Sequence, residues 1–252
     1  MKNLFRISLL LFILVLQNCS GPFYLKETRT SQTRIKQDSL QSVDSTIVKM
    51  IAPYKLKLDA QMNEVLNISD VELVKDRPEG TLCNFAADAV LNYGNRTYEK
   101  PVDFCVLNYG GLRLPSIQKG NITLGKIYEL MPFDNMVEVV EIDGASCKQL
   151  LDVIAKNGGW PVSGVKFKIN QSIAEDIFIK GQPFDINKTY MLVTSDYLVN
   201  GGDGLQMLKN LSKKTSLNYK IRDAIIEYVR EQKNNNQNIN TQKDGRITVV
   251  QP

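Results

Sequence analysis

Hydrophobic positions along the chain follow helical spacing in some segments and strand spacing in others. Apolar residues recur every three or four positions from Ile47 to Val65, which predicts a helix over residues 45–66. Pro53 lies inside that segment and predicts a kink or two abutting helices. The same spacing predicts further helices at four places: 81–93, 125–131, 145–156 and 221–230.

Short apolar runs, several of them rich in β-branched residues, predict strands between these helices. They fall at 71–74, 102–107, 137–142, 165–169, 177–179, 190–194 and 246–250. The segments 196–204 and 234–242 are predicted loops, the first rich in glycine and the second in Asn and Gln. Because strands and helices mix without strict alternation, we expect an α/β (mixed α+β) fold, a layered sheet-and-helix single domain over residues 44–252.

The N-terminal residues 1–19 have the pattern of a targeting segment. Lys2 and Arg6 precede an unbroken apolar run over 7–16, which has the length of a signal peptide and is short for a membrane-spanning helix. The run leads to Cys19, and the segment resembles a bacterial lipoprotein signal in which this cysteine is lipidated. The alternative is ordinary secretion with an incidental cysteine.

Residues 20–43 are polar, which is typical of a tether between an anchor and a folded domain, although part of this segment would also suit an edge strand. Together with Cys19, this organisation predicts an exported lipoprotein held to a membrane by its lipid, at the periplasmic face or on the outer membrane. A net charge of +4 on 252 residues gives no reason to expect a nucleic-acid partner.

The 252 residues include no histidine, which excludes Ser-His and Cys-His catalysis and histidine-bound metals within this chain. No two of the four cysteines have the spacing of a zinc or redox motif. We expect Cys83, Cys105 and Cys147 in the core as small apolar residues. A disulfide between Cys83 and Cys105 is the alternative in an oxidising compartment.

The segment 108–135 concentrates residue types that bind ligands. Gly110 and Gly111 let backbone amides approach a ligand closely, and Arg113 beside them is a forked donor for phosphate or carboxylate. Phe133 follows a proline at a turn, where its ring can serve as a stacking surface. The segment therefore predicts a binding site.

Four segments, in their order along the chain, together resemble the C-terminal domain of the 5′-nucleotidase family. They are EGTLCNFAAD (79–88), NYGGLR (108–113), PFDN (132–135) and DYLVNGGDG (196–204). The resemblance covers roughly residues 45–250. It implies a domain that recognises a nucleotide or nucleoside, since in that family a separate calcineurin-like domain carries two metals and hydrolyses the phosphate ester.

The resemblance also implies a role for each residue of the predicted site. Phe133 and Tyr197 would sandwich the base, with Tyr197 standing where phenylalanine is common, and Asn108 and Asn135 would hydrogen-bond the base. The structural alternatives are core aromatics for Phe133 and Tyr197 and a turn-forming role for Asn108.

For the sugar and phosphate, the resemblance implies that Asp203 accepts hydrogen bonds from the ribose and that Arg113 binds the phosphate. Gly110 and Gly111 complete this predicted site, and Arg77 lies close to the position of a further substrate-binding arginine but is shifted in register. A surface ion pair for Arg113 and a ligand-free capping role for Asp203 are the structural alternatives.

The segments that match the family do not include its metal-bearing domain, and a chain without histidine cannot build that domain's site. The chain is therefore not expected to be active alone. A separate dimetal phosphatase would supply the metals, and no cofactor is expected in this chain. The alternatives are a non-catalytic nucleotide-binding lipoprotein and a scaffold that has lost the ligand.

Overall fold

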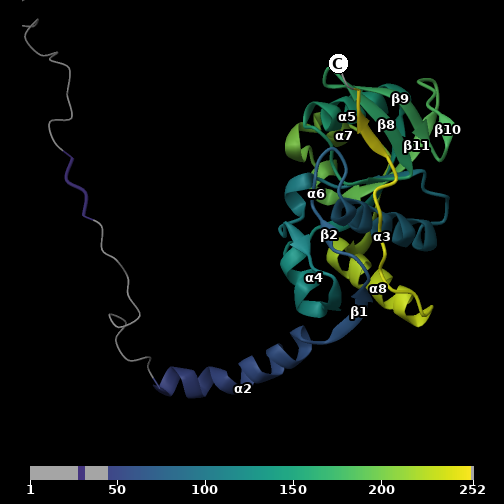
Figure 1. The fold of residues 1–252 in the computed structure, drawn as a ribbon. Helices are drawn as coiled ribbons and strands as arrows, with labels where there is room; N and C mark the ends of the chain where they lie inside the picture. The colour runs from purple at the N-terminus through teal and green to yellow at the C-terminus, as the bar shows by residue number, and fades with distance from the viewer. Residues whose placement is uncertain (1–27, 32–44, 251–252) are drawn as a thin grey trace, which may run out of the picture. The chain divides into compact units, whose positions relative to one another are not determined.

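The computed structural model describes residues 28–31 and 45–250. The predicted signal segment and Cys19, and nearly all of the predicted tether, lie outside the described residues. The chain divides into two units, Met1–Met50 and Ile51–Pro252. The second unit carries the fold that follows, drawn in Figure 1.

A five-stranded sheet lies at the centre of this unit, with strand order β12-β6-β11-β3-β7. β11 runs parallel to β3, and every other neighbouring pair is antiparallel. Its strands in chain order are β3 (Phe104–Val106), β6 (Met136–Asp143), β7 (Val162–Ser163), β11 (Thr189–Ser195) and β12 (Lys214–Lys220).

Alternating side chains of this sheet supply two separate hydrophobic cores. Val139 and Val193 point into one core, while Val140 and Leu192, their neighbours along the strands, point into the other. Because both faces are buried, the parallel strands β3 and β11 carry continuous apolar runs rather than the alternating pattern of a half-exposed sheet. The layered arrangement that the mixed pattern of elements predicts follows from this double burial.

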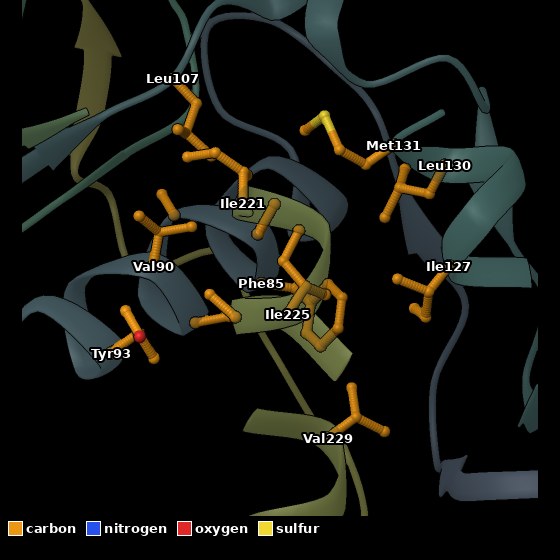
Figure 2. Packing of buried hydrophobic residues seen from close by; sticks show 14 of the residues in the cluster. Phe85, Val90, Tyr93, Leu107, Ile127, Leu130, Met131, Ile221, Ile225 and Val229 are labelled. Carbon is orange, nitrogen blue, oxygen red and sulfur yellow. The ribbon is translucent and has the colours of Figure 1, made fainter. Parts of the chain in front are cut away.

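Two helices cover the first face, α3 (Thr81–Thr97) and α8 (Ile221–Asn234), which pack against each other. Figure 2 shows Phe85 of α3 and Ile225 of α8 within this core, together with Ile127 of the short helix α4 (Leu124–Leu130). All three side chains are fully buried. The helical spacing of apolar residues in these segments therefore marks the faces that meet the sheet.

The second face is covered by α5 (Gly144–Lys156) and by a second sheet of strand order β10-β9-β8-β13. Figure 1 shows α5 beside β8 and β9, and α5 contacts β9. The strands of this sheet are β8 (Val165–Asn170), β9 (Ile173–Ile179), β10 (Gln182–Pro183) and β13 (Ile247–Val249).

The remaining elements are short, apart from one longer helix, α2 (Ser45–Met62). Two antiparallel pairs join β1 to β5 and β2 to β4. Their bounds are β1 (Val65–Ser69), β2 (Leu73–Val74), β4 (Ser116–Ile117) and β5 (Gly120–Thr123). Single turns of helix are η2 (Tyr109–Gly111), α6 (Asp196–Val199), η3 (Gly202–Gly204) and α7 (Gln206–Lys209). The mixed α/β single-domain fold is as predicted.

Predictions about local structure were wrong at several places. The helix expected through residue 66 ends at Met62, and β1 begins at Val65, a residue that fits both helical and strand spacing. The helix itself is one element that contains Pro53. β12 was missed because this edge strand, KTSLNYK, is polar and none of its residues is fully buried. The predicted loop 196–204 contains α6 and η3.

The three described cysteines, Cys83, Cys105 and Cys147, are buried free thiols in the cores, as predicted, and Cys83 and Cys105 do not form the alternative disulfide. Among the described helices, none is long and apolar enough to cross a membrane.

Candidate functional site

The topology of the central sheet brings three distant segments of the chain to one edge. Because β3 and β11 are parallel, their carboxyl ends lie at the same edge, and the antiparallel strand β6 begins there. Asn108 follows β3, Asn135 precedes β6 and Tyr197 follows β11. In open α/β sheets, ligands bind outside the carboxyl ends of parallel strands, so this edge is the expected place for a site.

A cavity of about 320 Å³ lies at this edge. Its lining consists of the eight residues that the sequence predicted as one binding site: Asn108, Gly110, Gly111, Arg113, Phe133, Asn135, Tyr197 and Asp203. The Phe133 and Tyr197 side chains are each 42% exposed, so neither is a core aromatic. Exposed aromatic rings in a cavity that also holds charged groups are suited to an amphipathic ligand.

The first wall of the cavity is the turn after β3. The Gly111 amide donates to the Asn108 carbonyl at 3.0 Å, and a Cβ atom added to Gly111 would lie 2.8 Å from Asn108 Oδ1. Glycine at this position therefore allows the Asn108 side chain to lie against the backbone. Arg113 Nη1 donates to the Gly110 carbonyl at 3.3 Å, and its guanidinium carbon lies 5.6 Å from the centre of the Phe133 ring. Within residues 45–250 the Arg113 guanidinium forms no ion pair.

The second wall is the turn that carries Phe133. Arg222 of α8 forms hydrogen bonds to this turn. Arg222 is 6% exposed, and its Nη1 donates to the carbonyls of Met131 and Phe133 at 3.3 and 3.4 Å. Its Nη2 donates to Asp134 Oδ1 at 2.7 Å. Sequence reasoning missed Arg222, because its partners lie about ninety positions earlier in the chain.

Asp134 also pairs with Lys220, whose Nζ lies 3.0 Å from Asp134 Oδ2. The hydrogen bonds from Lys220 and Arg222 lower the pKa of the Asp134 carboxyl below its usual value. On the neighbouring backbone, the Ile221 amide donates to the Asn135 carbonyl at 2.9 Å. The start of α8 therefore fixes the turn that carries Phe133 and Asn135.

The third wall comes from α6 and η3. The Tyr197 hydroxyl donates to Asp203 Oδ1 at 2.8 Å, and this bond raises the pKa of the Tyr197 phenol. A Cβ atom added to Gly202 would lie 2.5 Å from Cε1 of the Tyr197 ring, so the ring lies directly on the Gly202 backbone. Asp203 has a left-handed conformation with φ of 50°, which aspartate tolerates better than most residues.

Arg77, the additional predicted residue, is not among the residues that line the cavity. Its guanidinium carbon lies 4.0 Å from the centre of the Tyr109 ring, one residue from Asn108. Lys75 lies on the same ring at 4.1 Å and donates to the Leu112 carbonyl at 2.8 Å. Burial, and then the nearby positive charges of Arg113 and Arg77, lower the pKa of Lys75, a residue that sequence reasoning missed.

Lys75, Arg77 and Arg113 form no ion pair with any carboxylate in the described part of the chain. Lys75 is half-buried and the two arginines are exposed. Positive charges that lie close together without a counter-charge raise the local potential and favour an anionic ligand nearby. Over the same residues, no three side chains of His, Cys, Asp or Glu are grouped so that they could hold a metal ion. The described site therefore offers aromatic surfaces, one carboxylate and a cationic side.

Comparison with known proteins identifies the family. The profile described as 5'-nucleotidase, C-terminal domain, matches residues 60–210. The apyrase of Tabanus yao is 28% identical over 221 residues, covering 75% of this chain and 38% of the apyrase. Protein UshA of Escherichia coli (strain K12) is 28% identical over 171 residues, covering 65% of this chain and 30% of UshA.

A solved structure agrees with these matches. The 5'-nucleotidase precursor from Thermus thermophilus superposes with a TM-score of 0.69 and 25% identity, over 83% of this chain and 44% of that protein. This chain thus spans less than half the length of each of these three relatives. The matched residues run from the end of α2 through α7 and include every residue that lines the cavity. The chain belongs to the family of 5′-nucleotidase C-terminal domains.

Proposed function

We propose that this domain recognises a nucleotide or nucleoside for a 5′-nucleotidase-type phosphohydrolase in nucleotide catabolism. In this proposal the base stacks between Phe133 and Tyr197 and is hydrogen-bonded by Asn108 and Asn135. Asp203 accepts hydrogen bonds from the ribose hydroxyls. The backbone amides of Gly110 and Gly111, in the first wall, approach the ligand closely.

The observation that supports this proposal is the convergence of all eight predicted residues on one cavity. Its volume of about 320 Å³ lies at the lower end of the range of small-molecule sites, as suits a mononucleotide held in a partly open cleft. Charge is distributed as a nucleotide requires, because Asp203 lies on one wall and Arg113 on another. Arg113 would bind the phosphate, with Lys75 and Arg77 adding positive potential behind it.

We further propose that hydrolysis is carried out by a dimetal phosphatase encoded separately from these 252 residues. The chain contains no histidine to ligate such metals, and its relatives are more than twice as long as the segments that match it. The metals would belong to the phosphatase, which would polarise the phosphate and generate the attacking water. A lipid on Cys19 would hold the recognition domain at a membrane, at the periplasmic face or on the outer membrane.

Calorimetric titration with AMP and adenosine tests the recognition step. Wild-type protein is expected to bind both, and Phe133→Ala should weaken both by about 5- to 150-fold, because base stacking contributes about 1–3 kcal/mol. Phe178→Ala is the matched control, since Phe178 on β9 is 39% exposed and lies outside the cavity. Equal AMP affinity for the Phe133→Ala variant and the wild type would remove the stacking model.

Reconstitution tests the proposed partner. AMP and a divalent metal are supplied to a purified calcineurin-like phosphatase from the same organism, with and without this protein. A gain in the rate of phosphate release that disappears with Phe133→Ala supports the split enzyme. If nucleotide binds but the rate does not change with any such phosphatase, the domain is a binding protein without a hydrolytic partner.

A further inference from the structure

Tyr197 and Asp203 form a unit whose geometry goes beyond stacking on a base. The Tyr197 hydroxyl donates to Asp203 Oδ1 at 2.8 Å, and both residues line the cavity. Asp203 forms no ion pair within residues 45–250, so its carboxylate is left with free acceptor sites. The tyrosine ring can therefore contribute to a ligand site in two ways, through its face and through its hydroxyl.

The backbone fixes both members of this unit. Gly202 lies so close to the Tyr197 ring that a Cβ atom there would come within 2.5 Å of Cε1. Asp203 has φ of 50° and stands between Gly202 and Gly204, the latter with φ of 84°. A carboxylate can rotate broadly about its last side-chain bond. Since the backbone already sets the position of Cβ, the bond from Tyr197 is the contact that fixes the remaining rotation.

We propose that Tyr197 is a specificity-determining residue whose hydroxyl orients the Asp203 carboxylate toward two adjacent sugar hydroxyls, so that the cavity selects ribonucleotides over 2′-deoxyribonucleotides. The inference rests on the proposed function, in which Asp203 accepts hydrogen bonds from the ribose. A vicinal diol can donate to both carboxylate oxygens only when both of these oxygens point toward the diol. A 2′-deoxyribose lacks one donor and leaves a desolvated acceptor unsatisfied, which weakens binding.

The test compares the affinities of AMP and 2′-deoxy-AMP for the wild type, Tyr197→Phe, Asp203→Asn and the double variant, by calorimetry. The wild type is expected to prefer AMP by about tenfold, the usual effect of losing one hydrogen bond to a charged group. Tyr197→Phe keeps the stacking ring. It should bind 2′-deoxy-AMP within about twofold of the wild type but lose several-fold in AMP affinity. In the Asp203→Asn background, Tyr197→Phe should leave the ratio of the two affinities unchanged.

Tyr54→Phe is the control for removing a phenol hydroxyl, because Tyr54 lies on α2, is 77% exposed and is not part of the cavity. An unchanged ratio in Tyr197→Phe, or a wild type that binds the two nucleotides equally, would overturn the inference while leaving nucleotide recognition intact. A wild type that binds neither nucleotide would overturn the proposed function together with the inference.

Discussion

The residues that line the cavity were predictable from the sequence, whereas the residues that support the cavity from other elements were not. Asn108, Phe133 and Tyr197 were predicted because each sits in a short segment with a family pattern. Arg222 and Lys75 were not, because their relation to the site depends on packing between elements. A lone arginine at the start of an amphipathic helix has the sequence pattern of a surface residue, yet Arg222 is 6% exposed.

Replacing Arg113 by glutamine tests the assignment of the phosphate end. AMP affinity is expected to fall about 10- to 100-fold, since hydrogen bonds to charged groups contribute about 1.5–3 kcal/mol. Adenosine affinity should stay the same, because adenosine has no phosphate. Both are measured by calorimetry.

Arg230→Gln removes the same charge from the exposed face of α8 and serves as the control, with no effect expected on either ligand. A parallel loss of AMP and adenosine affinity in Arg113→Gln would show that Arg113 supports the cavity wall rather than the phosphate.

At the scale of elements, most helices were predictable because their apolar residues follow helical spacing, and the central strands because each carries a short apolar run. The boundary between α2 and β1 was not, since Val65 satisfies both spacings and the pairing of β1 with β5 decides the outcome. The strand β12 was not predicted, because it lies at the edge of the sheet and its residues are mostly polar. In α6, one turn of helix within a glycine-rich segment leaves too short a pattern to detect.

The start of α5 provides a prediction with a defined pH dependence. Asp143 caps this helix by accepting from the Ser146 amide at 2.8 Å, and this bond lowers the pKa of the Asp143 carboxyl. Asp143→Ala should reduce the free energy of unfolding by about 1 kcal/mol at pH 7. Because the folded-state pKa is the lower one, the stabilisation is present above about pH 4 and is lost as the pH falls through that folded value.

Guanidinium unfolding at a series of pH values measures this difference. It should stay constant above about pH 4 and shrink below that pH, as the carboxyl of the folded protein becomes protonated. Asp143→Asn is the control, since asparagine also caps helices but does not titrate. A constant difference between wild type and Asp143→Ala over this range would argue against capping by the ionised side chain.

At the scale of the whole molecule, two cores share one sheet, and the three described thiols lie inside them. Burial raises the pKa of Cys83 to about 11 and that of Cys147 to about 12, and raises the pKa of Cys105 well above its usual value. These thiols should therefore resist iodoacetamide at about pH 8 in the native protein and react fully in guanidinium.

Mass spectrometry of the alkylated peptides reads out each cysteine separately, so Cys19 does not interfere. Peptides joined through Cys83 and Cys105 without added oxidant, or rapid native alkylation of either residue, would contradict the packing of the first core.

A crystal structure of the protein with AMP is the decisive measurement for nucleotide recognition in this cavity. We expect the adenine between the rings of Phe133 and Tyr197, the ribose hydroxyls on Asp203 and the phosphate toward Arg113. An empty cavity at saturating AMP, or AMP bound at another surface, would contradict it.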